Sequence, residues 1–402
     1  MAFRTLDSLA PDELRGKRVL VREDLNVPLE DGRITDDTRI RAALPTLKAL
    51  RDRGAKIIVV SHLGRPKGVD PTLSLAPVAG RLGELLGVEV TFDPGFIGGK
   101  ASDAVARLQS GDVLLLENVR FKPEEEKNDP AFARELASLA DFYVNDAFGT
   151  AHRAHASTEG VARLLPSAAG YLMARELDVL GRIVSDPERP FWAIIGGSKV
   201  SSKIGVLRHL LSKVDGMVIG GAMANTFFKA KGLEVGKSLV EDDWLETARE
   251  VAAEAERRGV KLLLPVDVSI GTDPKSQKAG EVPVTAIPAD MSALDVGKAT
   301  IMDIYEALAG ARTILWNGPL GVFESEDFAV GTRKMAEMLA DLTHDKGATS
   351  VVGGGDSVAA LEQAGLADRI THVSTGGGAS LEFLEGQTLP GVAALESKAE
   401  VR

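Results

Sequence analysis

The sequence predicts an α/β protein made of two doubly wound parallel-sheet (Rossmann-like) domains that are joined by a helix and a hinge. Short apolar runs rich in Val, Ile and Leu alternate along the chain with amphipathic stretches of helical period. This alternation is typical of buried parallel strands connected by helices. At 402 residues, the chain is longer than one hydrophobic core usually supports, so we expect two domains of roughly 200 residues each.

The runs that we interpret as strands are continuously apolar, as strands covered on both faces are. They are Arg18–Val21, Lys56–Val60, Asp112–Leu116, Phe142–Val144, Trp192–Ile195, Gly216–Ile219, Lys261–Leu264, Thr313–Trp316 and Ser350–Val352. The clearest predicted helices between them are Asp37–Arg53, Ala131–Ala140, Ser201–Lys213, Trp244–Arg258 and Ser357–Ala364.

The predicted domain boundary follows a helix over Leu172–Val184, whose apolar residues recur at helical spacing. The next segment, 185–190, contains two prolines among charged and polar residues. We therefore expect an N-terminal domain over residues 1–172, an inter-domain helix and linker over 173–190, and a C-terminal domain over 191–390. An ordinary surface helix at 172–184 is an equally good interpretation of the same pattern.

Composition excludes several classes of protein. The net charge is -11, which argues against a general nucleic-acid binder because that role needs a basic surface. The chain has no cysteine, so disulfides, thiolate catalysis and cysteine zinc sites are excluded. We see no apolar signal segment at the N-terminus and no run approaching the ~20 apolar residues of a membrane span. We expect a cytoplasmic monomer that binds neither nucleic acid nor membrane.

In the first half of the chain, the predicted strands end in basic and polar residues. Open α/β sheets bind ligands at the carboxyl ends of their strands, and guanidinium groups bind phosphate and carboxylate in a bidentate manner. Several arginines at such positions therefore predict a pocket for a small anion, although an isolated arginine is usually just a surface residue. The residues are Arg39, Arg65, Arg120 and Arg153, with His62 and His152 beside two of them and Asp24 and Asn26 available for a substrate hydroxyl.

In the second half, the strand ends are rich in glycine. A glycine-rich turn between a strand and a helix lets backbone N–H groups approach phosphate oxygens. A single cluster is weak evidence, because glycine also serves tight turns and close packing. Several clusters at successive strand ends predict a site for a phosphate chain. They are 196–199, 220–223, 317–321, 353–357 and 375–378.

Four polar side chains beside these glycines are candidates for a catalytic or binding role, and each could instead have only a structural or surface role. Lys199 and Lys203 would share one face of a starting helix and could stabilise a transferring phosphoryl group, or they are two solvated lysines. Asp356 could hold Mg²⁺ together with substrate phosphates, or it could be a helix N-cap, a place that Ser357 could also fill. Glu324 could bind a ribose, although the pattern alone favours a surface acid.

Other familiar sites are missing from the sequence. We find no G-x-G-x-x-G after a strand, no Walker A loop, no G-x-S-x-G, no H-E-x-x-H and no H-R-D. The pair His152 and His155 lacks an evident third metal ligand. There is also no strong candidate for an activated nucleophile. Phosphoryl transfer to or from a carboxylate needs neither a nucleophilic side chain nor a general base, because a carboxylate is already ionised at neutral pH.

These segments together resemble the phosphoglycerate kinase family, of the bacterial type, over nearly the whole chain. The segments that carry the resemblance are 21–28, 61–66, 116–121, 146–157, 196–204, 315–324, 353–357 and 374–380. The resemblance implies reversible transfer of phosphate between 1,3-bisphosphoglycerate and MgADP, which gives 3-phosphoglycerate and MgATP in glycolysis. It also implies that the C-terminal tail, 391–402, completes the N-terminal domain.

By motif position, the resemblance assigns residues to three roles. The glycerate site falls on Asp24, Asn26, Arg39, His62, Arg65, Arg120 and Arg153. The nucleotide site falls on Gly197, Lys203, Gly221, Gly297, Asn317, Glu324 and Gly353, Gly354, Gly355, Asp356 and Ser357, with Asp356 as the Mg²⁺ ligand. The groups around the transferring phosphoryl are Arg39, Lys199, Lys203, Gly376 and Gly377.

The chain departs from the family pattern at Glu23, Leu25 and Ser198. We expect Glu23 and Leu25 to point away from the neighbouring site residues, because successive side chains alternate on an extended segment. The hypothesis for the mechanism is in-line transfer after domain closure, which expels water from the acyl phosphate. Two alternatives stay open: another acyl-phosphate or sugar kinase, and a nucleotide-binding protein without turnover.

Overall fold

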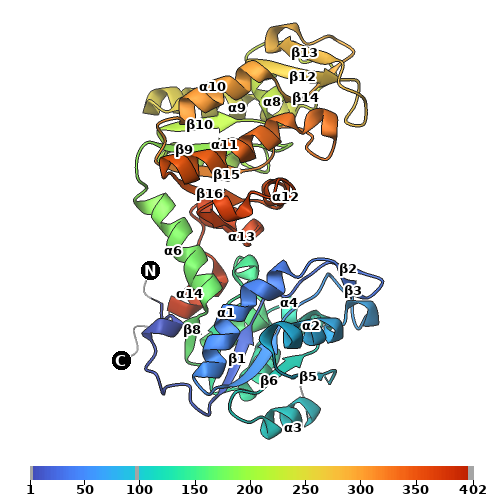
Figure 1. The fold of residues 1–402 in the computed structure, drawn as a ribbon, viewed down its shortest axis with the longest axis vertical. Coiled ribbons are helices and arrows are strands. Elements are labelled where there is room, and N and C mark those ends of the chain that lie inside the picture. The colour runs from blue at the N-terminus through green and yellow to red at the C-terminus, as the bar shows by residue number, and fades with distance from the viewer. Residues whose placement is uncertain (1–2, 96–98, 397–402) are drawn as a thin grey trace. The chain divides into compact units, whose positions relative to one another are not determined.

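The computed structural model describes residues 3–95 and 99–396, and these form two compact units. The first unit runs up to Asp178 and also takes in the segment from Thr388, whereas the second is the continuous stretch Val179–Gln387. The division therefore falls inside helix α6 (Tyr171–Ser185). Figure 1 shows the sheet and the helices of each unit.

The first unit is built on a six-stranded parallel sheet. Its order is β5 (Val90–Asp93), β6 (Val113–Leu116), β4 (Lys56–Val60), β1 (Arg18–Arg22), β7 (Phe142–Asn145) and β8 (Ser167–Ala169). The chain passes from β1 to β4 on one side and later reaches β7 on the other side, so the strand order reverses between β1 and β7. A reversal of this kind leaves a crevice at the carboxyl ends of the strands, where ligands bind.

Helices cover both faces of this sheet, as the continuous apolar strands require. In β1, Val19 and Val21 belong to the core formed with α1 and α2, while the intervening Leu20 is equally buried and faces the other way. The helices are α1 (Thr38–Asp52), α2 (Ala76–Leu86), α3 (Gly99–Arg107), α4 (Pro123–Glu126), α5 (Pro130–Ser138) and α14 (Pro390–Glu396), and a short hairpin is formed by β2 (Leu29–Glu30) and β3 (Arg33–Ile34).

The second unit has its own six-stranded parallel sheet. Its order is β11 (Lys261–Leu263), β10 (Gly216–Ile219), β9 (Phe191–Ile195), β15 (Thr313–Asn317), β16 (Thr349–Gly353) and β17 (His372–Val373). The strand order reverses between β9 and β15, where the backbone amide of Gly196 donates to the carbonyl of Asn317 at 2.9 Å. This places two of the glycine-rich segments at the reversal.

Besides the end of α6 and short 3-10 helices, the described part of the second unit contains seven α-helices and a small sheet. The helices are α7 (Ile204–Leu211), α8 (Met223–Ala230), α9 (Leu245–Arg258), α10 (Lys298–Leu308), α11 (Val330–Lys346), α12 (Gly355–Gln363) and α13 (Gly378–Leu384). The small sheet is antiparallel, in the order β13 (Gly280–Pro283), β12 (Asp267–Gly271), β14 (Ser292–Val296).

The predicted fold class is confirmed, and each predicted strand is present. The strands that the sequence did not reveal lack the apolar signal. Strand β8 is Ser-Ala-Ala, β17 has two residues, and β5 lies at the sheet edge with no buried residue. The antiparallel sheet was also missed, because Gly, Pro and charged residues interrupt its strands.

The C-terminal helix α14 packs on the first unit. The amide of Gly391 donates to the carbonyl of Ala151 at 2.9 Å, and any side chain at Gly391 would lie 3.1 Å from the Cα of Ala151. Val392, Ala394 and Leu395 are buried. Residues 397–402 of the predicted C-terminal tail lie outside the described residues.

A buried carboxylate holds the start of α6. Oδ1 of Asp146 accepts from the amide of Met173 at 3.1 Å, and Oδ2 is buried without a hydrogen-bond partner among the described residues. A Cβ at Gly170 would lie 2.3 Å from Oδ1, so only glycine leaves room for this approach. Burial raises the pKa of Asp146 from 3.8 to about 6, although hydrogen bonds from Thr46, Met173 and Leu172 oppose the rise.

We predict that Asp146→Asn changes how the stability of the first unit depends on pH. Because the pKa is higher in the folded chain than in the unfolded chain, the folded chain binds the proton more tightly. The contribution of Asp146 to the free energy of unfolding is therefore fully present below about pH 4, and it is lost as the pH rises through about 6. The difference between the pKa of Asp146 in the folded chain and in the unfolded chain corresponds to about 3 kcal/mol.

Urea unfolding, followed through the hydrogen exchange of strand amides in the first unit, measures this effect. Asp146→Asn should be more stable than the unchanged chain at pH 7.5 and should lose that advantage at pH 4. Asp12→Asn serves as the control, since Asp12 forms only an exposed ion pair with Arg15. Equal pH dependence in the Asp146 variant and the unchanged chain would contradict the assignment.

Candidate active site

The predicted anion-binding residues of the first unit come from loops and helices that follow the strands of one sheet. Asp24 and Asn26 follow β1, Arg39 lies in the first turn of α1, and His62 and Arg65 follow β4. Arg120 lies in the 3-10 helix Val119–Phe121 after β6, and Arg153 follows the 3-10 helix Phe148–Thr150 after β7. Because these strands are parallel, the segments that follow them all lie at the carboxyl end of the sheet.

His62 lies at the centre of a group of positive charges. Its side chain is buried, and its pKa is well below the ordinary value, first because of burial and then because of the charges of Arg22, Arg120, Arg39 and Arg153. The structure thus brings Arg39, Arg120 and Arg153 together around His62, and the ring is neutral at pH 7. A neutral imidazole can donate one hydrogen bond and accept another.

Arg120 is the most deeply buried of the predicted arginines. Its Nη1 donates to the carbonyl of Gly64 at 2.7 Å, and its Nε lies 3.2 Å from Oε1 of Glu126. Nη2 is buried and has no hydrogen-bond partner among the described residues. Burial lowers the pKa of Arg120, with the nearby charge of Glu126 acting against it. A buried guanidinium N–H without an acceptor is costly, and an anionic ligand would supply that acceptor.

The remaining predicted residues of this group have varied surroundings. Nη1 of Arg39 donates to Oδ2 of Asp24, and Oδ1 of Asn26 accepts from the amide of Gly64 at 2.8 Å. Nε of Arg153 donates to Nε2 of His152 at 3.1 Å. Arg65 is exposed. The ion pair with Arg39 shows that Asp24 also orients an arginine.

Sequence reasoning missed Arg22, the last residue of β1. It is completely buried and contacts Nδ1 of His62 through Nη2 at 3.2 Å. Nε of Arg22 donates to Oγ of Ser157 at 2.8 Å, and Ser157 in turn is bonded to Glu125. The available signal was an arginine that closes an apolar parallel strand, since a charge there must be paired.

In the second unit, three glycine-rich turns pack backbone against backbone. Gly221 has a φ of 68°, and a Cβ there would lie 2.5 Å from the carbonyl oxygen of Gly197. Gly318 has a φ of 99°, and its Cβ would lie 2.2 Å from the carbonyl oxygen of Gly196. These glycines are therefore required by close packing, the alternative that the sequence left open for each single cluster.

The later glycines are different, because open space lies beside them. A Cβ at Gly355 or Gly377 would meet no atom within 4 Å. Gly353 and Gly354 lie beside the side chain of Asn317, whose Nδ2 is buried without a hydrogen-bond partner among the described residues. The amide of Gly376 donates to Oγ of Ser374 at 3.2 Å.

Lys203 lies beside Asn317 in this second group. Nζ of Lys203 donates to Oδ1 of Asn317. Burial lowers the pKa of Lys203, and the charges of Asp356 and Glu385 oppose this, so both carboxylates lie near it. Lys199 is exposed.

The prediction that Lys199 and Lys203 share one face of a starting helix is wrong. Helix α7 begins at Ile204, and Lys203 is its N-cap residue. The segment before it stays in turns because Glu241 accepts from both the amide and the hydroxyl of Ser201, at 3.0 and 2.6 Å. Glu241 lies 40 residues away in sequence, so local propensity could not reveal this contact.

Neither candidate N-cap of α12 acts as one. The N-cap residue is Gly354, and no side chain caps the helix. Oγ of Ser357 accepts instead from the amide of Gly318 at 2.6 Å, which ties two glycine turns together. Asp356 is exposed in the first turn of α12. Its carboxylate is therefore available to a ligand.

The last two predicted nucleotide-site residues lie in other turns. Glu324 is exposed in the turn after β15. Gly297 is the N-cap of α10, and a Cβ there would lie 2.2 Å from Cγ of Asp267. Asp267 accepts from the amides of Ala299 and Thr300 at 3.0 and 2.8 Å. Packing against this capping carboxylate is thus sufficient to explain the glycine.

The described residues contain no cluster of three or more His, Asp or Glu that could hold a metal ion. His152 and His155 accordingly have no third ligand among them. A protein-only metal cage is thus absent from the part of the chain that the structure describes, whereas Asp356 suits an ion that takes one carboxylate and several phosphate oxygens.

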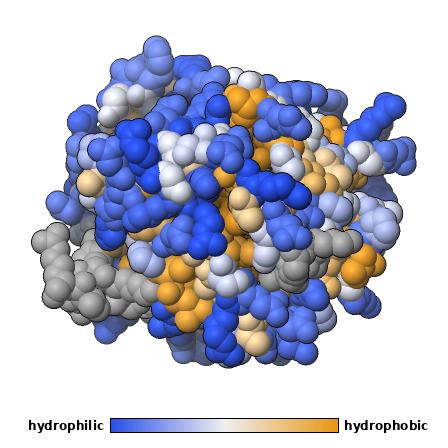
Figure 2. All heavy atoms as spheres, turned by 90° about the horizontal axis from the view of Figure 1, so that it is seen from below, coloured by the Kyte–Doolittle hydropathy of each residue, from blue (hydrophilic) through white to orange (hydrophobic). Residues whose placement is uncertain are grey.

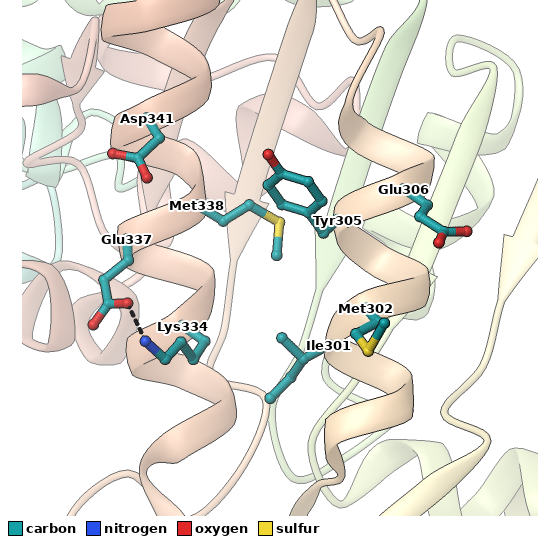
Figure 3. A pocket seen from close by; sticks show the side chains of 8 residues that line it. All are labelled: Ile301, Met302, Tyr305, Glu306, Lys334, Glu337, Met338 and Asp341. Atoms are coloured by element: carbon teal, nitrogen blue, oxygen red, sulfur yellow. Dashed lines mark hydrogen bonds and ion pairs between the residues drawn. The ribbon is translucent and has the colours of Figure 1, made fainter.

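A surface groove of about 300 Å³ between α10 and α11 contains none of the predicted site residues. Figure 3 shows Ile301 and Tyr305 on one helix pointing toward the helix that carries Met338, where Lys334 and Glu337 form an ion pair at 2.6 Å. Figure 2 shows another face, which is mainly hydrophilic with separate small hydrophobic patches. None of the described helices could cross a membrane.

Comparison with known proteins identifies the family. The family model described as phosphoglycerate kinase matches residues 9–387. The cytosolic phosphoglycerate kinase of Triticum aestivum is 59% identical over 396 residues, which cover 98% of both chains. The phosphoglycerate kinase of Pelotomaculum thermopropionicum is 58% identical over 400 residues, which cover 99% of this chain and 100% of the relative. The chain belongs to the phosphoglycerate kinase family.

A solved structure agrees with this assignment. The phosphoglycerate kinase from Coxiella burnetii is 42% identical, has a TM-score of 0.90, and covers 99% of this chain and 100% of its own. The predicted family and enzyme class are thus confirmed: the chain is a kinase of glycolysis that transfers phosphate. The alternatives of another kinase or of a binding protein without turnover are not favoured.

We predict that Gly221→Ala destabilises the second unit of this phosphoglycerate kinase family member by about 3 kcal/mol, because the new Cβ meets backbone atoms and the φ of 68° disfavours alanine. Gly355→Ala is the matched control. It has open space, so its stability should be unchanged or up to about 1 kcal/mol higher.

Tryptophan fluorescence during urea unfolding measures both variants, since Trp192 and Trp316 are buried in the strands of the second unit. Equal stability of the two variants would contradict the view that the first glycine turns are packed shut while the later ones are open.

Proposed function

We propose that the two groups of residues divide the reaction between them. The basic group of the first unit binds 1,3-bisphosphoglycerate or 3-phosphoglycerate, and the glycine turns of the second unit bind MgADP or MgATP. The observation that best supports this division is the neutral His62 ringed by Arg22, Arg39, Arg120 and Arg153. So many cations around one buried ring in a chain of net charge -11 call for a small, strongly anionic ligand.

The proposed glycerate site offers donors of different geometry. Arg120 has a buried Nη2 without a partner among the described residues, which suits one oxygen of a phosphate or carboxylate. Arg39, Arg65 and Arg153 add charge at the periphery. Asp24 and Asn26 complete the site by accepting or donating at a substrate hydroxyl.

The proposed nucleotide site centres on Lys203 and Asn317. Lys203 is half-buried and has a lowered pKa, and a negatively charged phosphate chain beside it would stabilise its ammonium group. The unpartnered Nδ2 of Asn317 and the amides around Gly353–Gly355 add donors that can follow phosphate oxygens. Gly197, Gly221, Gly297, Glu324 and Ser357 belong to the same proposed site.

Mg²⁺ fits this arrangement through Asp356. The carboxylate is exposed at the start of α12, and it is close enough to Lys203 for its charge to raise the pKa of that lysine. Mg²⁺ commonly takes one or two carboxylates and completes its shell with substrate phosphates and water. When bound, the ion would neutralise charge on the nucleotide phosphates.

The transfer itself needs no general base. An oxygen of the terminal phosphate of ADP attacks the phosphorus of the acyl phosphate, a P–O bond to ADP forms, and the P–O bond to the carboxylate breaks. The carboxylate leaves with the electron pair and stays ionised, so no proton moves. Arg39, Lys199, Lys203 and the amides of Gly376 and Gly377 are our proposed stabilisers of the phosphoryl oxygens.

In-line transfer after domain closure stays a prediction. Because each substrate is proposed to bind a different unit, closure would bring the reacting atoms into line and exclude water. X-ray scattering should show compaction when both substrates are added to the chain, and an unchanged radius of gyration would remove the hypothesis. We further propose that the chain acts as a monomer in the cytoplasm, as the relative from Triticum aestivum is named cytosolic.

A coupled assay with 3-phosphoglycerate, ATP and Mg²⁺ tests the reaction. Turnover with 3-phosphoglycerate but not with acetate supports the proposed substrate. Turnover only with another carboxylate or a sugar would identify a different kinase, and nucleotide binding without turnover would identify a binding protein.

We predict that Arg39→Ala lowers kcat by about 10²–10³-fold and changes KM much less, because the charge acts mainly in the transition state. Arg41→Ala is the matched control, since Arg41 lies on the same helix with an exposed side chain paired to Asp37. Steady-state kinetics decide the matter, and a normal kcat in the Arg39 variant would remove its proposed role. Arg65→Ala should instead raise KM for 3-phosphoglycerate.

We predict that Asp356→Asn raises the Mg²⁺ concentration needed for half-maximal rate by about tenfold or more, because one ionised ligand is lost. Asp368→Asn, at an exposed position in a 3-10 helix of the same unit, should leave the requirement unchanged. A Mg²⁺ titration of the coupled assay measures both, and an unaltered requirement in the Asp356 variant would contradict its assignment as ligand.

A further inference from the structure

Every nitrogen of the Arg22 guanidinium has a partner. Nε donates to Oγ of Ser157 at 2.8 Å, Nη1 donates to the carbonyl of Glu23, and Nη2 lies 3.2 Å from Nδ1 of His62. The side chain is completely buried. Its orientation is therefore fixed by three contacts on three different segments of the first unit.

The contact with His62 determines where the proton of the imidazole lies. A guanidinium only donates hydrogen bonds, so Nδ1 of His62 must accept. Burial and the surrounding arginine charges keep the ring neutral. A neutral imidazole carries one proton, and with Nδ1 as the acceptor that proton lies on Nε2.

Ser157 holds Arg22 in the orientation that this requires. Its hydroxyl donates to Oε1 of Glu125 at 2.5 Å, so a lone pair of the same oxygen remains for Nε of Arg22. The amide of Ser157 donates to Oε2 of Glu125 at 2.9 Å, and Oη of Tyr143 donates to its carbonyl at 2.8 Å. The serine cannot easily turn away from Arg22.

Glu125 supplies the charge that balances this chain of contacts. It lies in α4, it is completely buried, and both carboxylate oxygens accept from Ser157. Burial raises its pKa, while the charge of Arg22 acts in the opposite direction. The nearest other ionisable group that forms a pair with it is His155, whose Nδ1 lies 3.8 Å from Oε1.

We propose that Ser157 and Glu125 are positioning residues for the reaction: through Arg22 they hold His62 as the neutral tautomer protonated on Nε2, which donates to an oxygen of the bound glycerate. This rests on the proposed role of His62 in substrate binding. The oxygen that meets Nε2 must then accept. The site thereby favours an ionised carboxylate or phosphate over an amide nitrogen or a protonated acid at that point.

The matched variants are Ser157→Ala and Ser167→Ala. Both serines are buried in the first unit, but Oγ of Ser167 has no hydrogen-bond partner among the described residues. Ser157→Ala should raise KM for 3-phosphoglycerate about tenfold, the effect of losing one hydrogen bond to a charged group. KM for ATP should not change, and kcat should fall by less than about threefold. Ser157→Thr keeps the hydroxyl and should restore KM.

The tautomer is read directly by ¹⁵N–¹H correlation spectroscopy of the histidine-labelled full chain, with His62→Gln to assign the signal. We expect an unprotonated Nδ1 and a protonated Nε2 in the unchanged chain and in Ser167→Ala. In Ser157→Ala we expect averaging between the two tautomers.

Several results would overturn the inference. They are a proton on Nδ1 in the unchanged chain, a doubly protonated ring at pH 7, or an unchanged KM for 3-phosphoglycerate in Ser157→Ala. If Ser157→Ala does not fold, the tautomer of the unchanged chain together with Ser157→Thr decides the question. Absence of turnover with 3-phosphoglycerate would contradict the proposed function, while the spectrum would still report the tautomer.

Discussion

The direction of the strands is the constraint on which the rest of the structure depends. In each six-stranded sheet all neighbouring strands pair in parallel. The residues that follow the strands therefore all lie at the same end of the sheet, the carboxyl end. The order reverses between β1 and β7 in one sheet and between β9 and β15 in the other. Residues that follow different strands lie far apart in sequence, but they come together at the carboxyl ends of the strands, where open α/β sheets bind ligands.

The carboxyl ends of the two sheets have the same strand geometry but differ in the residues that they carry. At the first, arginine charges are buried and must be balanced, which Glu125, Asp24 and Glu126 do in part. At the second, backbone turns pack so tightly at Gly196, Gly221 and Gly318 that side chains are excluded. The remaining glycines have open space beside them, and the buried Nδ2 of Asn317 has no hydrogen-bond partner among the described residues. We propose that these groups donate to phosphate oxygens.

Sequence reasoning succeeded where the information is local. Continuous apolar runs identified the strands from β1 to β16 that carry buried branched side chains. The strand ends also predicted site roles for His62, Arg120 and Lys203, and these roles stay predictions. It failed where a distant residue decides. The turn before α7 is held by Glu241, so Lys199 and Lys203 do not share one face of a helix. Arg22 was overlooked because its partners, Ser157 and His62, lie on other segments.

The packing of α14 has a consequence for how the chain is made. The second unit is one uninterrupted stretch, Val179–Gln387, whereas the first takes its last helix from beyond it. During synthesis the second unit can therefore fold as soon as its own residues have emerged. The first unit, although it emerges earlier, lacks the contact of Gly391 with Ala151 until the segment after the second unit has emerged as well. The first unit therefore begins to emerge before the second unit, but its fold is completed after that of the second unit.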